Sequence, residues 1–266
     1  MSEFLLRVMD EKRTEMRAVS ATQRLQLERK ARALQHRAGR LVDSLLREGV
    51  RIIAEFKRSS PSAGAIQAAA DPANLARSYD AAGAAAISVL TEPKYFGGSL
   101  ADLATVRVSS RLPLLRKDFV VDAFQLYEAV IAGGDAALLI VAGLNDTELS
   151  DLLRVCAELK LDALVEVHTP EEMERAAGAG AKLIGVNNRD LKTLEVSLET
   201  SLRLAEIAPR DAILISESGL RTAEDIRMLR AVGYKGFLIG ETLMRAEDPQ
   251  RALADLIAHG TSEATA

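Results

Sequence analysis

The residue types best suited to proton transfer appear first at Glu55 and Lys57, which follow the apolar run of residues 52–54 and precede the loop sequence SSPSAG. Residues two apart in an extended strand project from the same face, so this carboxylate and ammonium can lie side by side and exchange protons with a substrate. A buried charge is costly unless it is paired, and a buried pair rarely adds stability over apolar residues. The pair is therefore either a salt bridge on an edge strand or two groups at the mouth of a closed sheet, where a substrate can reach them.

Further polar residues follow the later apolar segments of the chain. They are Thr91 and Glu92, Lys117 and Asp118, Glu166 and His168, residues 187–190 (NNRD), residues 216–219 (SESG), and Gly240 with Glu241. A single polar residue at one strand end can be an ordinary solvated loop residue. Polar residues at most of the strand ends are more than the stability of a barrel requires. We expect them to gather at one catalytic face; a catalytically silent barrel that serves as a scaffold is the alternative.

The elements that must position these residues are short apolar segments that alternate with amphipathic ones. We expect strands to end near Glu55, Val89, Leu115, Ile140, Glu166, Val186, Ser216 and Ile239. The intervals leave room for one helix and two loops each, which indicates a parallel sheet covered by helices. Eight such βα units predict a closed (β/α)8 barrel, with catalytic residues at the carboxyl ends of the strands.

Two glycines near the end of the chain point to an anion site. Gly219 precedes a helix that Thr222 is expected to cap, and Gly240 precedes a short helix that begins with Glu241. Glycine lets backbone N–H groups approach an anion, and the loops after strands seven and eight are the usual phosphate site of this fold. We expect the Glu241 side chain to point away from the anion. Two ordinary helix-entry turns are the alternative.

The composition limits the class of protein. The chain has 266 residues, 48% of them hydrophobic, and a net charge of −4, which argues against a general nucleic-acid binder. The only cysteine, Cys156, predicts a buried thiol and no disulfide framework. The N-terminus does not resemble a targeting peptide, and the longest apolar run, residues 136–144, is too short to span a bilayer. We expect a cytoplasmic protein with no nucleic-acid or membrane partner, either monomer or homodimer.

No metal or other cofactor is expected. The histidines His36, His168 and His259 are dispersed, and no dinucleotide-binding fingerprint is present. A Mg²⁺ ion between Glu55 and Glu166 remains an alternative, although two lysines already supply positive charge there. His168 should leave its strand on the same face as Glu166, as a residue lining the mouth.

Residues 1–48 are expected to form a charged helical extension with one apolar face, carrying Leu27, Leu34, Leu41 and Leu45 at helical spacing. We expect residues 49–260 to form the barrel domain and residues 261–266 a disordered tail.

Eight long motifs cover all the expected strand ends in order. They are IIAEFKRSSPSAG, ISVLTEPKYFGGSL, LPLLRKDFVVDAFQLYEA, ALLIVA, LVEVH, IGVNNRDLKTLEV, ISESGL and FLIGETLMR. Together with the helical extension, they resemble the indole-3-glycerol phosphate synthase family of tryptophan biosynthesis, in its monofunctional form. The resemblance implies a lyase that closes the ring of 1-(2-carboxyphenylamino)-1-deoxyribulose 5-phosphate with loss of CO2 and water. It also implies that the extension lies across the catalytic mouth, so we expect the four leucines to cover that opening.

The resemblance also implies roles for individual residues. Lys117 corresponds to the general acid, Glu166 to the catalytic carboxylate of the dehydration half, and Lys57 to the lysine that holds the substrate carboxylate. Glu55 and Asn187 correspond to residues that orient these groups. The chemistry agrees, because ring closure needs an acid at the ketone oxygen, and dehydration needs both an acid and a base. Which residue protonates the leaving hydroxyl stays open.

The remaining matched residues bind the rest of the substrate. Ser218 corresponds to a substrate contact, Ser60, Gly219, Gly240 and Glu241 to the phosphate site, and Phe96, Phe119 and Leu191 to the apolar walls around the aromatic ring. Ala63 is a departure, because many members of the family have lysine there. Another phosphate-binding barrel, such as phosphoribosylanthranilate isomerase or the tryptophan synthase α subunit, is the alternative enzyme.

Overall fold

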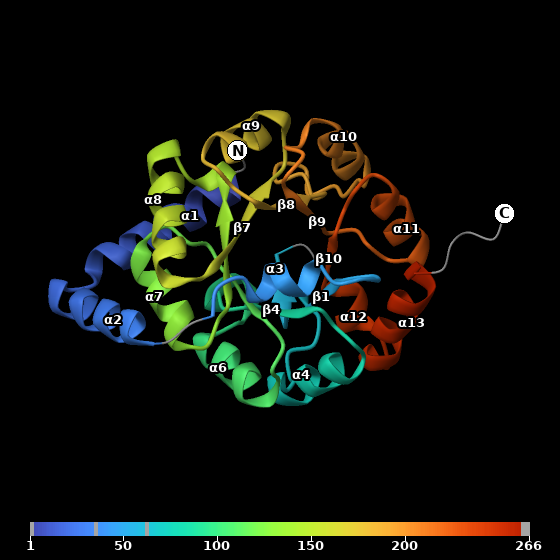
Figure 1. Cartoon of the computed structure of the whole chain (residues 1–266). Coiled ribbons are helices and arrows are strands. Elements are labelled where there is room, and N and C mark those ends of the chain that lie inside the picture. The colour runs from blue at the N-terminus through green and yellow to red at the C-terminus, as the bar shows by residue number, and fades with distance from the viewer. Residues whose placement is uncertain (1–2, 35–36, 62–63, 262–266) are drawn as a thin grey trace.

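Eight parallel strands form a closed barrel in the computed structural model, which describes residues 3–34, 37–61 and 64–261 (Figure 1). The strands are β1 (Ile52–Phe56), β4 (Ala86–Leu90), β5 (Leu114–Lys117), β6 (Ala136–Ile140), β7 (Asp162–Val167), β8 (Leu183–Asn187), β9 (Ile213–Glu217) and β10 (Gly236–Ile239). Strand β1 pairs with β4 on one side and with β10 on the other, so the sheet has no free edge. The predicted (β/α)8 barrel is confirmed.

A ring of helices covers the outside of the barrel, one after each strand (Figure 1). They are α4 (Pro72–Ala81), α6 (Leu100–Ser109), α7 (Ala123–Ile131), α8 (Asp146–Leu159), α9 (Pro170–Gly178), α10 (Glu199–Ile207), α11 (Ala223–Ala231) and α13 (Pro249–Thr261). Short helices α5 (Pro93–Phe96), η1 (Val141–Gly143) and α12 (Glu241–Arg245) follow β4, β6 and β10. Thr222 caps α11 as expected, because its side chain accepts a hydrogen bond from the Asp225 backbone.

The strands end within two residues of the predicted positions. The predictions at Ile140 and Ile239 coincide with the structure, and the others fall one or two residues short. In β5, β8 and β9 the reason is that the backbone ladder continues past the last apolar residue. Lys117 still pairs with Leu90, and Asn187 still pairs with Glu217. Polar side chains are thereby held by strand backbone at the carboxyl end of the barrel.

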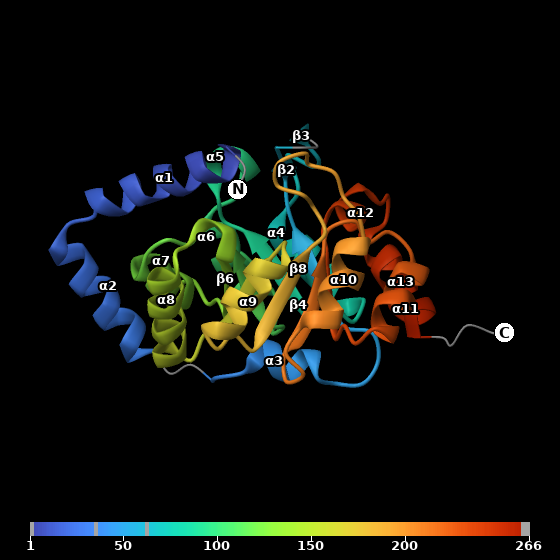
Figure 2. The ribbon, with the colours of Figure 1, turned by 90° about the horizontal axis from the view of Figure 1, so that it is seen from above.

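The N-terminal extension consists of three helices that run from one end of the barrel to the other. They are α1 (Glu3–Ala18), α2 (Ala21–Ala33) and α3 (Arg40–Leu45). In Figure 2, α1 lies beside α5 at the end that also carries the hairpin β2 (Ser59–Ser60) and β3 (Gly64–Ala65), and α3 lies at the opposite end. The segment α2 runs along the outside, packed against α7.

The prediction that Leu27, Leu34, Leu41 and Leu45 cover the catalytic mouth is wrong. Leu41 and Leu45 are fully buried at the amino end of the barrel, where Leu45 packs against Gly236 at the start of β10. Leu27 is partly buried on α2, and Leu34 is 47% exposed. The helical spacing misled because the leucines belong to separate helices, so they do not share one face. The mouth is covered instead by α1.

Three expectations concern residues outside the described ranges: Ala63, the departure in the first loop; His36; and residues 262–266 of the expected tail. Thr261, the first residue of that expected tail, belongs to α13 instead. Within the described ranges, none of the helices has the length and apolar character needed to cross a membrane.

Cys156 is buried in α8 as predicted, and burial raises the pKa of its thiol to about 12.

Candidate active site

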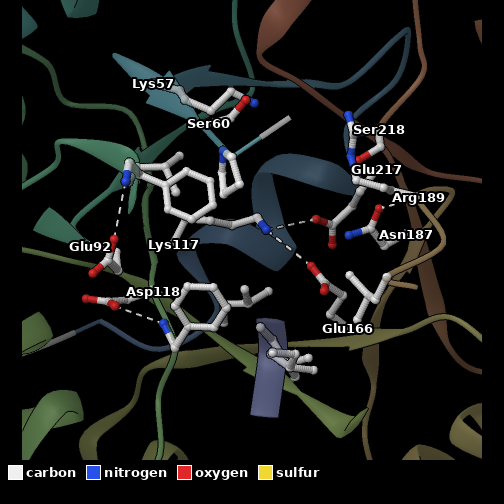
Figure 3. A pocket seen from close by; sticks show the side chains of 18 of the residues that line it. Lys57, Ser60, Glu92, Lys117, Asp118, Glu166, Asn187, Arg189, Glu217 and Ser218 are labelled. Atoms are coloured by element: carbon white, nitrogen blue, oxygen red, sulfur yellow. Dashed lines mark hydrogen bonds and ion pairs between the residues drawn. The ribbon is translucent and has the colours of Figure 1, made fainter. Parts of the chain in front are cut away.

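A cavity of about 270 Å³ opens at the carboxyl ends of the strands, between the barrel and α1. Ten of the predicted site residues line it: Glu55, Lys57, Ser60, Phe96, Lys117, Phe119, Glu166, Asn187, Leu191 and Ser218. Figure 3 shows six of them, Lys57, Ser60, Lys117, Glu166, Asn187 and Ser218, around one space. Gly219, Gly240 and Glu241 are not among the lining residues.

Lys117 lies at the centre of the cavity, between two carboxylates (Figure 3). Its Nζ donates to Glu166 Oε2 at 3.2 Å and lies 3.4 Å from Glu217 Oε2. Burial lowers the pKa of Lys117, but the negative charge of Glu166, and that of Glu217 when it is ionised, outweigh burial and raise the pKa above its usual value. The group is therefore a protonated ammonium at neutral pH, and it can donate a proton to a substrate oxygen.

The neighbours of Lys117 in β5 hold the strand end in place. Arg116 and Asp118 form a buried ion pair at 3.0 Å, on the face opposite Lys117. Arg116 also pairs with Glu128 of α7 at 3.0 Å, and Asp118 accepts a hydrogen bond from the Phe119 backbone at 2.8 Å. This network fixes the backbone around Lys117 and Phe119, so Asp118 has a structural role.

Glu166 is an ionised carboxylate in spite of its burial. Burial raises its pKa, but the charges of Lys117 and His168, together with a hydrogen bond from Asn187, lower the pKa below the usual value. Its second oxygen, Oε1, lies 3.4 Å from Nε2 of His168. A carboxylate held in this way can accept a proton from a carbon acid next to it.

Glu217 is a site residue that the sequence analysis did not single out. It extends from the end of β9 to the far side of Lys117, and it is 2% exposed. Burial raises its pKa most, and although the Lys117 ammonium lowers it, the charges of Glu166 and Glu55 add to burial and bring the pKa to about 8. Glu217 therefore carries a proton at neutral pH while Glu166 does not. The position of Glu217 in the SESG sequence, at the end of a strand, is the sequence signal that could have marked it as a site residue.

Glu55 and Lys57 form the ion pair that the sequence allowed, with Glu55 Oε1 at 3.0 Å from Lys57 Nζ. Glu55 is buried and accepts a hydrogen bond from Ser88 at 3.3 Å, whereas Lys57 reaches the cavity. Gly240 leaves room for this carboxylate, because a Cβ at position 240 would lie 2.5 Å from Glu55 Oε1. The pair is thus at the mouth of a closed sheet and not on an edge strand.

Aromatic rings form the wall of the cavity beneath α1. The Phe96 and Phe119 ring centres lie 6.1 Å apart, and Phe4 of α1 lies 6.3 Å from Phe119 and 5.0 Å from Tyr95. Glu92 fixes this wall, since its carboxylate accepts hydrogen bonds from three backbone N–H groups of α5. Phe4 was not predicted to line the site, because no sequence signal marks one apolar residue of a charged helix as the cover of a cavity.

Comparison with known proteins assigns the family. A model of the family described as indole-3-glycerol phosphate synthase matches residues 5–256. The chain belongs to the indole-3-glycerol phosphate synthase family. It is a decarboxylating carbon–carbon lyase of tryptophan biosynthesis, as the resemblance predicted.

Named relatives agree with this family assignment. The chain is 51% identical over 209 residues to indole-3-glycerol phosphate synthase of Desulfosudis oleivorans, which covers 79% of this chain and 80% of that one. It is 42% identical over 259 residues to the same enzyme of Syntrophobacter fumaroxidans, covering 96% and 98%. A thiamine phosphate pyrophosphorylase from Pyrococcus furiosus, with 16% identity and a TM-score of 0.59 over 79% of this chain and 95% of that one, shares the fold.

The backbone of the first loop expected to bind phosphate in this family is in the left-handed region at Ser218 and Gly219. Ser218 and Gly219 both have positive φ, at 67° and 80°, and a Cβ at 219 would lie 2.5 Å from Val196. Glu241 pairs with Arg245 at 2.9 Å along α12, so its side chain points away as expected. Among the described residues, no three His, Cys, Asp or Glu side chains are grouped as metal ligands.

His168 is placed differently from the prediction. It does not line the main cavity but a second cavity of about 240 Å³ behind Glu166. Arg189, which the sequence analysis placed at a strand end without a role, lines both cavities. This structure thus has a second cavity next to the main one, lined by His168 and Arg189.

Proposed function

We propose that Lys117 is the general acid of ring closure in the conversion of 1-(2-carboxyphenylamino)-1-deoxyribulose 5-phosphate to indole-3-glycerol phosphate. The observation that carries this role is the position of its ammonium between two carboxylates, 3.2 Å from Glu166 and 3.4 Å from Glu217. As the aromatic carbon attacks the ketone carbon, negative charge develops on the ketone oxygen, and a fixed ammonium stabilises and protonates it.

Glu166 is proposed as the base of the dehydration half. After CO2 has left, the hydroxyl must depart and the carbon beside the nitrogen must lose a proton. Glu166 is ionised and can take that proton, whereas Glu217, with a pKa raised by burial to about 8, holds a proton at neutral pH. We propose that Glu217 returns a proton to Lys117 between the two acid steps.

Lys57 is proposed to hold the substrate carboxylate until it leaves as CO2. Its ammonium lines the cavity, and Glu55 fixes it from below at 3.0 Å. Asn187 hydrogen-bonds Glu166 and so orients it. The aromatic ring is proposed to lie against Phe96, Phe119 and Leu191, all of which line the cavity.

The substrate phosphate is proposed to bind at the loops after β9 and β10. Ser60 and Ser218 line the cavity on that side, and the backbone of Gly219, Gly240 and Glu241 leads into two helices whose N–H groups favour anions. A substrate analogue without phosphate should bind much more weakly, and sulfate should compete with the substrate. Equal affinity for the substrate and for the analogue without phosphate would contradict a phosphate site at these loops.

The setting of the enzyme is also part of this proposal. The substrate is a small phosphorylated molecule, and the net charge of −4 does not favour nucleic acid. We propose a cytoplasmic enzyme that works as a monomer or a homodimer, on a barrel of residues 49–260. Sedimentation of the purified protein, with and without substrate, distinguishes the two oligomeric states.

The activity is tested by mixing the purified chain with its substrate. We expect the indole product, measured by its fluorescence, and CO2 to form in equal amounts without added metal. A catalytically silent scaffold would produce neither, and an isomerase of the preceding step would act on a different phosphorylated amine.

A further inference from the structure

Asn188 is a buried amide that lies between two cavity-lining residues without lining the cavity itself. Its neighbours Asn187 and Arg189 both reach the main cavity, whereas Asn188 is 1% exposed and is absent from the cavity wall. A buried amide is costly unless its donors and its acceptor are all paired. The partners of Asn188 therefore show what this residue does for the site.

The amide nitrogen of Asn188 holds the end of β9 and the start of the loop that follows it. Nδ2 donates to Ser216 Oγ at 2.9 Å, to the Glu217 carbonyl at 3.0 Å and to the Ser218 carbonyl at 3.0 Å. Two N–H bonds thus face three acceptors on three successive residues. The last of these, Ser218, lines the main cavity and begins the loop proposed to bind phosphate.

The other end of the amide determines which way the group points. Oδ1 accepts a hydrogen bond at 3.0 Å from the backbone N–H of Ser201, in the first turn of α10. An N–H group in a first turn has no acceptor within its own helix, and it can only donate. The atom facing Ser201 must therefore be the amide oxygen, which leaves the nitrogen to face Ser218. The Tyr234 hydroxyl donates to the Ser201 carbonyl at 2.8 Å and completes this buried network.

The loop that Asn188 holds has an unfavourable backbone. Ser218 and Gly219 are both in the left-handed region, which a residue with a Cβ such as Ser218 rarely adopts. The Ser218 carbonyl and the Gly219 N–H belong to one trans peptide, so they point in opposite directions. Because Asn188 binds that carbonyl, the Gly219 N–H points away from Asn188. The Glu217 carbonyl determines the direction of the Ser218 N–H in the same way.

We propose that Asn188 is a positioning residue for the substrate phosphate. By binding the carbonyls of Glu217 and Ser218, it aims the backbone N–H groups of Ser218 and Gly219 together at the anion. Neighbouring N–H groups that point the same way are what a phosphate needs from a protein backbone. Asn188 touches no substrate atom and acts through the loop. This role rests on the phosphate site proposed above.

The test is Asn188→Asp, which keeps the shape of the side chain and the acceptor for Ser201 but cannot donate to the two carbonyls. Misplacing a binding group by about 1 Å can cost a factor of about 10². We expect KM to rise about tenfold to a hundredfold, and the inhibition constant of sulfate to rise by a similar factor. We expect kcat to change less, because the backbone N–H of Asn188 still holds the Glu217 carbonyl at 2.9 Å. Asn188→Ala, which buries no carboxyl, should give the same pattern.

Tyr234→Phe is the matched control. It removes the hydrogen bond to the Ser201 carbonyl from the same buried network but leaves the bonds to Glu217 and Ser218 in place. We expect Tm to fall in Tyr234→Phe and in both Asn188 variants, and KM and sulfate inhibition to change only in the Asn188 variants. The substrate analogue without phosphate should bind equally well to wild type and to Asn188→Asp.

A second substitution separates loop positioning from a general loss of stability. Glycine adopts the left-handed region at little cost, so Ser218→Gly should lower the KM of Asn188→Ala, although it removes a hydroxyl that lines the cavity. Wild-type KM and sulfate inhibition in both Asn188 variants, or KM effects of Asn188→Ala and Ser218→Gly that simply multiply, would overturn the role of Asn188. The proposed phosphate site fails differently, because sulfate would then not compete with the substrate in wild type.

Discussion

Gly185 of β8 faces Glu217 of β9 so closely that a Cβ at position 185 would lie 2.0 Å from Glu217 Oε1. The glycine therefore leaves the space in which the Glu217 carboxyl reaches Lys117. The glycine in the strand sequence LIGVN of β8 therefore determines where the Glu217 carboxyl lies relative to Lys117. It also explains why the barrel accepts a large polar side chain at that level.

Gly185→Ala should displace Glu217 from Lys117. The extra methyl group costs roughly 1–3 kcal/mol of the free energy of unfolding, because the neighbouring carboxyl must move. We expect kcat to fall at least tenfold with an unchanged circular dichroism spectrum. Gly178→Ala is the control, since no atom lies within 4 Å of a Cβ there. Wild-type turnover in Gly185→Ala would show that the position of Glu217 does not matter.

The pH dependence of activity should report Glu217. Burial raises its pKa to about 8, so the carboxyl carries a proton below that pH and loses it above. We expect kcat to decline as pH rises through about 8, and the decline to be absent in Glu217→Gln. A basic limb that persists unchanged in Glu217→Gln would assign it to another group.

The same shift makes a prediction for stability. Because the pKa of Glu217 is higher in the folded protein, folding favours the protonated form. The stabilisation is complete below the unfolded pKa of about 4.5 and is lost as pH rises to about 8. The free energy of unfolding of wild type should therefore fall more steeply across this window than that of Glu217→Gln. Parallel curves from chemical denaturation would contradict the shift.

Glu166→Gln should allow ring closure and block dehydration. The amide keeps the shape of the carboxyl, but it cannot take the proton from the carbon beside the nitrogen. Rapid-quench analysis should show a dihydroxy-indoline-like intermediate that accumulates while CO2 is released. If substrate loss and indole formation stay in step, Glu166 does not belong to the second half of the reaction.

The extension should divide into two functional parts. A chain starting at Arg37 lacks α1 and α2 but keeps α3, so we expect a folded barrel with a raised KM because Phe4 no longer covers the cavity. A chain starting at Glu48 also loses Leu41 and Leu45 from the amino end. Their burial contributes roughly 1.5–3 kcal/mol each, so its Tm should be much lower. Equal Tm values for both chains would show that α3 does not close the barrel.

The fold followed from the sequence because its signals are local. Apolar segments, helix caps such as Thr222, and intervals that fit one helix each are readable without knowing any contact. The strand-end rule also placed Lys117 and Glu166 at the catalytic face, together with Asp118, but the choice of Lys117 and Glu166 as acid and base rested on the family resemblance.

The parts that escaped prediction depend on contacts between distant segments. Glu217 matters because it meets Lys117 across the barrel in the space beside Gly185. Gly240 accommodates Glu55, a relation that no spacing within one segment reveals. The leucines of the extension were assigned to one face, but α2 ends at Ala33, and Leu41 and Leu45 belong to α3 at the opposite end of the barrel.

The most direct test of the central claim is the turnover of Lys117→Ala, measured by indole fluorescence and CO2 release from the same reaction. Lys182→Ala is the control, because Lys182 is an exposed lysine paired with Asp211 far from the cavity. The account predicts normal folding and a loss of about 10² to 10⁴ in kcat for Lys117→Ala, with wild-type kcat for the control. Turnover of Lys117→Ala within a few-fold of wild type would contradict the account.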